Sequence, residues 1–419
     1  HLLDTKVGDY QAMIPMVDID AIGHGGGSIA YIDAGGIFRV GPQSAGADPG
    51  PACYGRGGVD PTSTDAQVVL GRLRSDRGLA GGLALKEDLA LSAMQNLANE
   101  LGMPTKQAAL GALQIQKFSM VQAIELNSVR RGYDPREFTL VAAGGAGPLF
   151  ACDIALELEI PRVLVPPHPG ILSATGLLAT DIQHDFVATE RHQLEVIDKV
   201  RLSSAFEDLG RRAVAQLDAD GVEEGDRLIR RLADCRYGGQ GYEVRFDVPV
   251  GDIDDHWVAD LAESFHHAHE AEYGHRFDQA VEIINIRVIG VGRIPELQWP
   301  EIAVGDPDPT AAKLLEREVV FDVGGKAESH TTPFYDRERL LANNRIEGPA
   351  IVEQYDTTTV IPPGCAASVD AYGNLIIDCQ RAVAETSSDL ATPILMRVIG
   401  GAFTQIAQEM AGVLYRMSY

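Results

Sequence analysis

The sequence lacks the features that mark secreted, zinc-binding or membrane-spanning proteins. Its five cysteines, among 419 residues, are widely spaced and form no C-x-x-C pair. An odd, scattered set indicates neither a disulfide framework nor a cysteine zinc site, and it favours a reducing compartment. No apolar run reaches the ~20 residues that cross a bilayer. The N-terminus also lacks the charged, then apolar, pattern of a signal peptide. We therefore expect a cytoplasmic protein that does not bind to membranes.

Basic residues are also scarce. The chain has 35 Lys and Arg against 60 Asp and Glu, a net charge of −25. No local basic patch offsets this charge, so phosphate backbones and anionic lipid surfaces would be repelled, and nucleic acid is not an expected partner. Hydrophobic residues make up 45% of the chain, enough to bury several cores. The length predicts two or three domains.

Hydrophobic patterning predicts strands first and then helices. From "MIPMVDIDAIG" to "GGIFRVGPQSAG", short apolar runs broken by glycine indicate strands and tight turns. The segments "KEDLALSAMQNLANELG" and "PTKQAALGALQIQKFSMVQAIELNSVRRG" have helical spacing, with a glycine near each C-terminal end. Next come a strand at 138–142, a glycine turn, a helix at 149–156 and a strand at 162–165. This β-turn-α-β unit implies a parallel strand pair and an α/β domain.

The rest of the chain predicts three further regions. Residues 186–299 have an α+β pattern, with helices near 202–218 and 254–273 and the strand "VEIINIRVIGVG". Residues 300–380 contain short alternating stretches between Pro and Gly, which predict a small β-rich module. Residues 381–419 begin as a polar linker and continue as "ILMRVIGGAFTQIAQEMAGVLYRMSY", with helical spacing. We expect this last segment to be the first helix of another domain, cut short.

Two glycine-rich turns are candidates for holding an anion. The first, after a predicted strand, offers backbone N–H groups and one hydroxyl. The second precedes a predicted helix, whose N-terminus favours negative charge. Either turn by itself is as often a plain tight turn or bulge, so the pair is more informative than its members. The candidate binding residues are Gly25, Gly26, Gly27 and Ser28 in the first turn and Gly144, Gly145, Ala146 and Gly147 in the second.

The order of these turns resembles that of the actin-like ATPases. In that fold a strand-glycine-strand phosphate loop is followed, after helices, by a strand-GG-helix loop beside the adenosine. The first phosphate loop of the fold, an Asp-x-Gly, has no counterpart here. The chain begins at His1 in what resembles mid-domain sequence, so we expect an N-terminal lobe to be missing. The resemblance implies an actin-like (ribonuclease H-like) α/β core over residues 1–185.

Longer stretches resemble one family within that fold. They are "GHGGGSIAYIDAGG", "RVGPQSAGADPGPACYGRGG", "PTSTDAQVVLGRL", "RGYDPREFTLVAAGGAGPL", "PRVLVPPHPGILSATGLL" and "GPAIVEQYDTTTVIPPG". Together they resemble the A component of the hydantoinase/5-oxoprolinase family, whose relatives include acetone-type carboxylase subunits. The resemblance covers nearly the whole chain. The C-terminal segment of the chain resembles the start of the B component, which suggests an A–B fusion like that of 5-oxoprolinases.

This resemblance implies an ATP-dependent hydrolase for a cyclic amide such as a hydantoin or 5-oxoproline. Because an amide carbonyl is a poor electrophile, phosphorylation of its oxygen by ATP, with Mg²⁺, would make a better leaving group. A B-like component, fused or separate and holding a further divalent metal, would complete the reaction in an oligomer. Two alternatives remain open: a subunit of an acetone- or acetophenone-type carboxylase that acts on a ketone, and a non-catalytic actin-like ATPase switch.

Three polar residues near the first turn are candidate catalytic residues. The loop "GADPGPACYGRGG" contains Asp48, which could hold Mg²⁺ or water, and Arg56, which could meet phosphate. The alternative is a structural Ω-type loop, in which Cys53 is a buried apolar residue rather than a nucleophile. Asp65 in "TSTDAQVVLG" most simply caps a helix, and a catalytic role is the second interpretation.

Two motifs in the α+β region have competing interpretations. "FHHAHEAEYGH" contains i,i+4 pairs but lacks the H-E-x-x-H order, which favours a solvated or packing helix face over a metal site. "CRYGGQGYEV" resembles a glycine-rich hairpin of the family. Its Tyr237, Gln240 and Tyr242 either reach towards the substrate or the B component, or belong to a plain hairpin.

Overall fold

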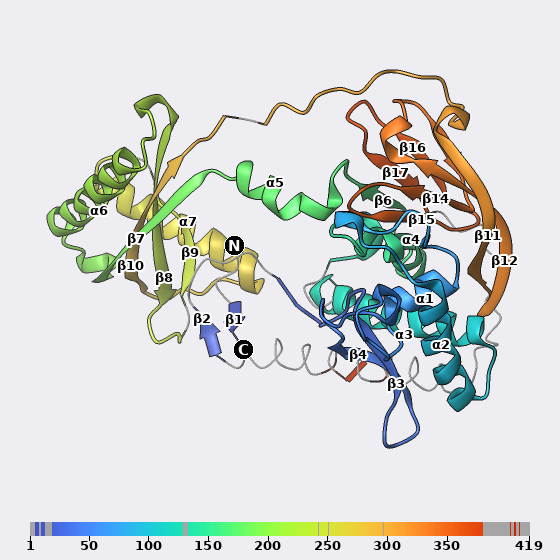
Figure 1. Ribbon diagram of the computed structural model, residues 1–419. Helices are drawn as coiled ribbons and strands as arrows, with labels where there is room; N and C mark the ends of the chain where they lie inside the picture. The colour runs from blue at the N-terminus through green and yellow to red at the C-terminus, as the bar shows by residue number, and fades with distance from the viewer. Residues whose placement is uncertain are drawn as a thin grey trace. The chain divides into compact units, whose positions relative to one another are not determined.

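The computed structural model describes residues 5–7, 10–12, 19–128, 133–241, 243–249, 251–295 and 297–379, and positions 403, 406, 407 and 410. The chain forms two compact units (Figure 1). Unit 1 comprises His1–Leu172 and Trp299–Tyr419, and unit 2 comprises Ser173–Gln298. The described helices include none with the length and apolarity that a membrane span needs.

The first part of unit 1 packs three helices beside a β-hairpin. Strands β3 (Ser28–Ile32) and β4 (Phe38–Ser44) pair antiparallel, and a second short hairpin joins β1 (Thr5–Val7) to β2 (Tyr10–Ala12). Helices α1 (Ser63–Val69), α2 (Glu87–Leu101) and α3 (Thr105–Ser128) contact one another. Both helices predicted after Gly81 are confirmed, and Gly102 ends α2 with φ +66°.

The strand expected before the first glycine turn is only partly covered by the structure. Residues 13–18 lie outside the described residues, and residues 19–24 have no regular secondary structure. The turn is therefore preceded by irregular chain where the structure describes it, and it is followed directly by β3.

The second part of unit 1 contains the predicted β-turn-α-β unit. Strands β5 (Thr139–Val141) and β6 (Arg162–Val165) are parallel neighbours, and α4 (Gly147–Glu157) connects them, which confirms the prediction. Their sheet continues through three strands that come much later in the chain, in the order β13-β16-β17-β6-β5. These strands are β13 (Arg345–Glu347), β16 (Ala366–Val369) and β17 (Leu375–Asp378).

Residues 300–380, expected as a module of their own, share a core with the earlier part of unit 1. Ile377 of β17 pairs with Val163 of β6, and both are fully buried. A second sheet, β11 (Lys313–Val323), β12 (Lys326–Asp336), β14 (Ala350–Glu353) and β15 (Thr358–Ile361), packs its last strand on α4. One hydrophobic cluster extends over both sheets and the helices. The physical reason is that β17 has apolar side chains that are buried when it pairs with β6 on one edge and β16 on the other.

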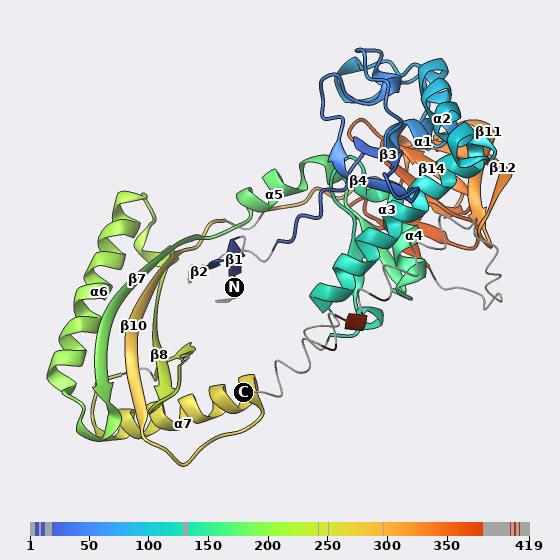
Figure 2. The same cartoon turned by 90° about the horizontal axis from the view of Figure 1, so that it is seen from below.

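Unit 2 is an antiparallel sheet with two helices (Figure 2). Its order is β7 (Ile182–Gln193), β10 (Val281–Gly292), β8 (Arg227–Tyr237), β9 (Val244–Asp247). Helices α6 (Lys199–Ala219) and α7 (Asp255–Tyr273) bury apolar side chains in one cluster with the sheet. The helices and strands predicted for this region are confirmed within a few residues. A shorter helix, α5 (Leu172–Leu178), precedes β7.

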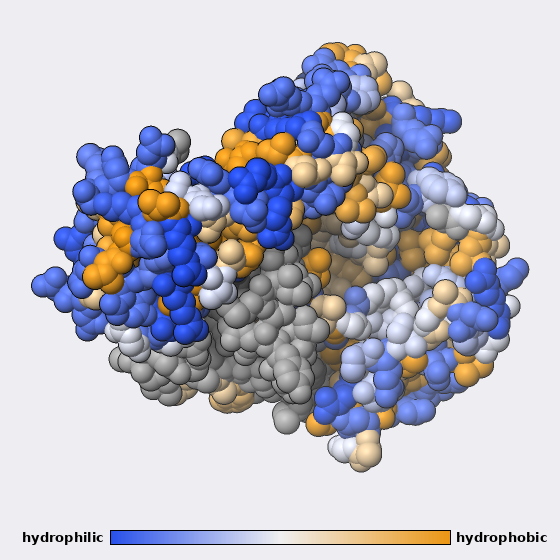
Figure 3. Space-filling model, turned by 90° about the vertical axis from the view of Figure 1, so that its left-hand side faces the viewer, coloured by the Kyte–Doolittle hydropathy of each residue, from blue (hydrophilic) through white to orange (hydrophobic). Residues whose placement is uncertain are grey.

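The surface contains both hydrophilic and hydrophobic side chains. On the face drawn in Figure 3, hydrophilic side chains surround small groups of hydrophobic ones. Exposed apolar residues of unit 2 include Val196, Val200 and Leu228. Scattered apolar side chains of this kind are usual on soluble domains.

Candidate active site

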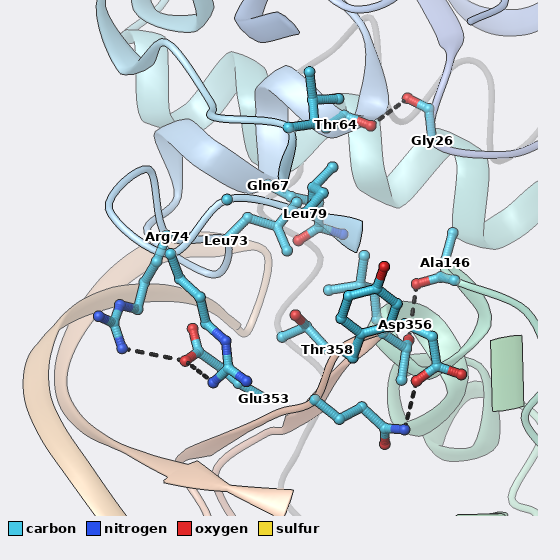
Figure 4. A pocket seen from close by; sticks show the side chains of 18 of the residues that line it. Gly26, Thr64, Gln67, Leu73, Arg74, Leu79, Ala146, Glu353, Asp356 and Thr358 are labelled. Atoms are coloured by element: carbon cyan, nitrogen blue, oxygen red, sulfur yellow. Dashed lines mark hydrogen bonds and ion pairs between the residues drawn. The ribbon is translucent and has the colours of Figure 1, made fainter. Parts of the chain in front are cut away.

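Unit 1 contains a cavity of about 380 Å³ that both glycine turns line (Figure 4). Gly26 comes from the first turn, and Gly145 and Ala146 come from the second. The remaining wall is formed by α1, the loop after it, the start of α4 and the connection between β14 and β15. The structure thus places the two turns, more than a hundred residues apart in sequence, on one cavity.

Neighbouring helices hold the first turn in place. Thr64 of α1 donates to the Gly26 carbonyl oxygen from its backbone N–H (2.9 Å) and from Oγ1 (2.8 Å). Gln116 of α3 donates from Nε2 to the Gly25 carbonyl (3.1 Å). The Ser28 hydroxyl accepts the Gly25 N–H (2.9 Å) and is buried, so it closes the turn. Among the described residues, no hydrogen bond is recorded from the Gly26 N–H.

The close packing explains why two glycines are needed here. A Cβ on Gly26 would lie 2.8 Å from Thr64 Oγ1, and a Cβ on Gly27 would lie 2.8 Å from Ser44 Oγ. Both separations are shorter than non-bonded contacts allow. Hydroxyl groups of the protein itself therefore approach these positions closely, and a side chain at either residue would displace them.

The second turn is held against the connection between β14 and β15. Gly144 has φ +77° and donates to the Pro169 carbonyl (2.7 Å). Thr357 donates from Oγ1 to the Gly145 carbonyl (2.8 Å). Ala146 is the N-cap of α4 and Gly147 its first residue. The positive end of the α4 dipole therefore lies at the turn, where negative charge is favoured.

Ionic groups form one wall of the cavity. The buried Glu353 carboxylate accepts from Arg74 (3.1 Å) and Arg77 (2.9 Å). Arg74 also pairs with Asp76 (2.6 Å), and that hydrogen bond raises the pKa of Arg74. Asp356 accepts from Gly170 N (2.8 Å) and Gln354 Nε2 (2.6 Å). Glu353 and Asp76 are thus paired with arginines, whereas the Asp356 carboxylate is held by neutral amide donors.

Part of the lining is apolar. Leu73, Leu79, Leu83, Leu149 and Phe150 all contribute to the cavity. Polar side chains, among them Ser63, Thr358 and the ionic groups described above, line much of the rest, so the lining is mixed. The cavity therefore combines backbone groups of the two turns with apolar side chains.

Sequence reasoning missed the residues from 353 to 358. The segment "GPAIVEQYDTTTVIPPG" contributed to the family resemblance, but no site role was predicted for it. An available signal was the run of Glu353, Gln354, Asp356 and Thr357 directly after a buried strand end, because ligands gather at strand ends in α/β folds.

Asp48 and Arg56 lie outside this cavity. The exposed Asp48 lines a second cavity together with Ser44 and Asp60, and the two cavities have no lining residue in common. Arg56 is exposed and donates to the Ala47 carbonyl (3.3 Å). Among the described residues, no group of three or more His, Cys, Asp or Glu side chains could hold a metal ion. Mg²⁺ binding by Asp48 stays a prediction, and its position does not fit a metal shared with the first cavity's ligand.

Asp65 caps a helix, which was the first of the two roles considered for it from the sequence. It forms a capping box with Thr62 at the start of α1, which confirms helix capping. It also accepts the N–H groups of Ala52 (3.2 Å) and Cys53 (2.7 Å). Burial raises the pKa of the Cys53 thiol, as expected for a packed rather than a nucleophilic cysteine. Asp65 lines neither cavity, and its catalytic role stays a prediction.

His266 and His269 of the histidine-rich helix are engaged in packing, whereas His267 is exposed. The Tyr237 hydroxyl lies 2.6 Å from His266 Nδ1. Buried His269 accepts from Gln240 (3.0 Å) at Nε2, and its Nδ1 lies 2.8 Å from the His275 carbonyl oxygen. These contacts favour the packing interpretation of the helix. Tyr242 lies outside the described residues.

Two family models together match most of the chain, and their boundary near residue 187 differs from that of the two structural units. The family model described as Hydantoinase/oxoprolinase matches residues 1–186, and the Hydantoinase/oxoprolinase C-terminal domain matches residues 188–377. The B-like segment at 381–419 lies beyond both matches, and nearly all of it lies outside the described residues.

Three curated relatives are similar to most of this chain. An uncharacterized protein of Methanocaldococcus jannaschii is 38% identical, over 89% of this chain and 52% of its own length. Caprolactamase subunit alpha of Pseudomonas jessenii is 34% identical, over 86% and 52%. The acetophenone carboxylase gamma subunit of Aromatoleum aromaticum is 33% identical, over 88% and 52%. The chain thus spans about half the length of these relatives.

A solved structure has the same fold. The crystal structure of the ATP-dependent caprolactamase from Pseudomonas jessenii superimposes with a TM-score of 0.74 and 33% identity, covering 89% of this chain and 54% of that one. The similarity therefore extends over both units described above, within a longer polypeptide.

Proposed function

The chain belongs to the hydantoinase/oxoprolinase family, and we propose on this premise that it is part of an ATP-dependent enzyme that activates a cyclic amide for ring opening. The substrate class is a lactam, hydantoin or 5-oxoproline type of ring. The core around the two glycine turns is proposed to be an actin-like nucleotide-binding domain. A B-like component would complete hydrolysis of the activated amide.

The observation that supports this proposal is the single cavity shared by Gly26 and Gly145. A triphosphate needs backbone N–H donors, and the Gly26 N–H and the N-terminus of α4 are suitable for it. A purine needs an apolar slot, which Leu73, Leu79 and Phe150 offer in the same cavity. The residues present therefore fit ATP, whereas a metal partner for it is not evident among them.

The residues of the cavity would act by binding and orientation. When bound, ATP would supply a phosphoryl group to the amide oxygen, with ADP leaving and water later displacing phosphate. Gly26 and the first turn of α4 would bind the phosphate oxygens. The Arg74–Glu353–Arg77 cluster would fix the opposite wall. The leucines would exclude water from the site, which strengthens each of these polar contacts.

A carboxylase subunit is the second candidate, because a relative with 33% identity is named as an acetophenone carboxylase subunit. The two functions differ in what ATP turnover requires. A hydrolase needs only a cyclic amide, whereas a carboxylase needs a ketone and bicarbonate.

Phosphate release by the full-length protein with its partner component separates these functions. The substrates to compare are caprolactam, 5-oxoproline, hydantoin and acetophenone, each with and without bicarbonate. Release that depends on a cyclic amide supports the proposal, and release that needs acetophenone and bicarbonate favours the carboxylase. Release independent of every substrate would contradict both and indicate a nucleotide switch.

A further inference from the structure

Gln67 of α1 is a buried amide without a hydrogen-bond partner. Its side chain is 1% exposed and lines the cavity. Neither Oε1 nor Nε2 has a partner among the described residues. Figure 4 shows the amide facing the cavity near Leu73 and Leu79. These apolar neighbours cannot satisfy either atom.

Two other buried glutamines of unit 1, Gln116 and Gln114, do form hydrogen bonds. Gln116 of α3 donates to the Gly25 carbonyl and accepts from the Ser63 hydroxyl. Gln114 of α3 donates to Asp322 (2.5 Å). Buried polar groups normally have partners because an unsatisfied amide is costly. Gln114 Oε1 also has no partner among the described residues, but of these three glutamines Gln67 alone leaves both a donor and an acceptor free, and it does so on the cavity wall.

The two free atoms define the chemistry of a ligand. An amide side chain offers an acceptor and a donor about 2 Å apart in one plane. The matching group has a donor and an acceptor side by side, as in the edge of a cis-amide or of an amidine. The nearby Thr64 hydroxyl donates to the Gly26 carbonyl and forms no hydrogen bond with Gln67.

We infer that Gln67 is a specificity-determining residue whose amide pairs with the cis-amide or amidine edge of a ring bound between the leucines. The inference rests on the proposed function, which supplies two rings with such an edge. One is the adenine of ATP, with its amino group beside a ring nitrogen. The other is the lactam of the substrate, with its N–H beside the carbonyl oxygen.

The test uses Gln67→Met in the full-length protein, since methionine has a similar volume and no hydrogen-bonding amide. Gln114→Met is the matched control, because Gln114 is a buried amide of unit 1 that does not line the cavity. Titration calorimetry measures the affinities for ATP and for inorganic tripolyphosphate, which has no base. Steady-state phosphate release measures the half-saturating lactam concentration. Gln67→Leu repeats each measurement should the methionine variant fold poorly.

If Gln67 pairs with adenine, Gln67→Met should weaken ATP binding about tenfold and leave tripolyphosphate binding unchanged. A lactam partner predicts a similar rise in half-saturating lactam concentration with unchanged ATP affinity. Either result supports the inference if Gln114→Met leaves both values unaltered. The ligand-free Gln67→Met variant should also unfold at a Tm higher by about 2 °C, because a buried unsatisfied amide is removed.

Unchanged affinities for ATP and for the lactam in both Gln67 variants would overturn the inference while leaving the proposed function intact. Wild-type protein that binds neither ATP nor a lactam would overturn the proposed function, and the inference with it.

Discussion

Replacing Asp65 by asparagine distinguishes structural anchoring from catalysis. Asp65 is fully buried. Its Oδ2 accepts from Ala52 N (3.2 Å), Thr62 N (2.9 Å) and Thr62 Oγ1 (2.7 Å), and its Oδ1 accepts from Cys53 N (2.7 Å). One carboxylate thus joins the start of α1 to the loop that precedes it.

The cost of Asp65→Asn follows from these four hydrogen bonds. An asparagine oxygen in place of Oδ2 keeps three of them, and its NH₂ group then faces the Cys53 N–H. The unsatisfied Cys53 donor costs about 2 kcal/mol, and the three remaining bonds lose their charge assistance, a further ~2 kcal/mol in total. We expect the free energy of unfolding to fall by roughly 4 kcal/mol.

Denaturant unfolding and phosphate release together provide the assay. Asp65→Asn should lower the unfolding midpoint, while phosphate release per folded molecule changes little. Asp60→Asn, at an exposed position in the same loop, is the control and should shift stability by no more than about 0.5 kcal/mol. A variant as stable as the wild type that had lost phosphate release would refute the anchoring argument and indicate a catalytic Asp65.

Two further predictions concern the first glycine turn and the acid stability of unit 2. Gly26→Ala places a Cβ 2.8 Å from Thr64 Oγ1. We expect ATP binding to weaken about fivefold or more, because that hydroxyl is displaced. If calorimetry gave the variant and the wild type equal affinities for ATP, the turn would be excluded from the site. At the N-terminus of α7, the hydrogen bond from Trp257 N lowers the pKa of Asp254. The ionised Asp254 therefore stabilises the folded state at pH values above the ordinary pKa of aspartate. This stabilisation is lost as the pH falls through the lowered pKa of Asp254 in the folded protein. Asp254→Asn should consequently differ from wild type in Tm at pH 6 but approach it below about pH 3, and a pH-independent difference would contradict this.

Elements with local signals could be predicted from the sequence. The end of α2 is set by Gly102, whose φ of +66° other residues rarely adopt. The whole of β10 matches the stretch "VEIINIRVIGVG". Helices α6 and α7 each begin after an aspartate that accepts a backbone N–H. Such signals depend on neighbours within a few residues, so no knowledge of the fold is required to interpret them.

The candidate site was less accessible to sequence reasoning. The order of the two glycine turns suggested that they act together, and the shared cavity is consistent with that expectation. The position of Asp48 on a different cavity could not be foreseen, because a loop rich in Pro and Gly has no periodicity that fixes the direction of its side chains. That Gln67 lacks a hydrogen-bond partner among the described residues could not be predicted either, because the neighbours of a buried side chain depend on the tertiary structure.

The sequence by itself determined where helices begin and end, where the chain turns, and which family it belongs to. Only the tertiary structure decided which distant segments meet. Glu353 and Asp356 reach the cavity beside Gly145 because β15, which pairs with β14, packs on α4, although about two hundred residues separate these residues from Gly145 in the chain. The alternation of a strand specifies which of its faces is buried, but the partner strand or helix is chosen by the packing of the whole core.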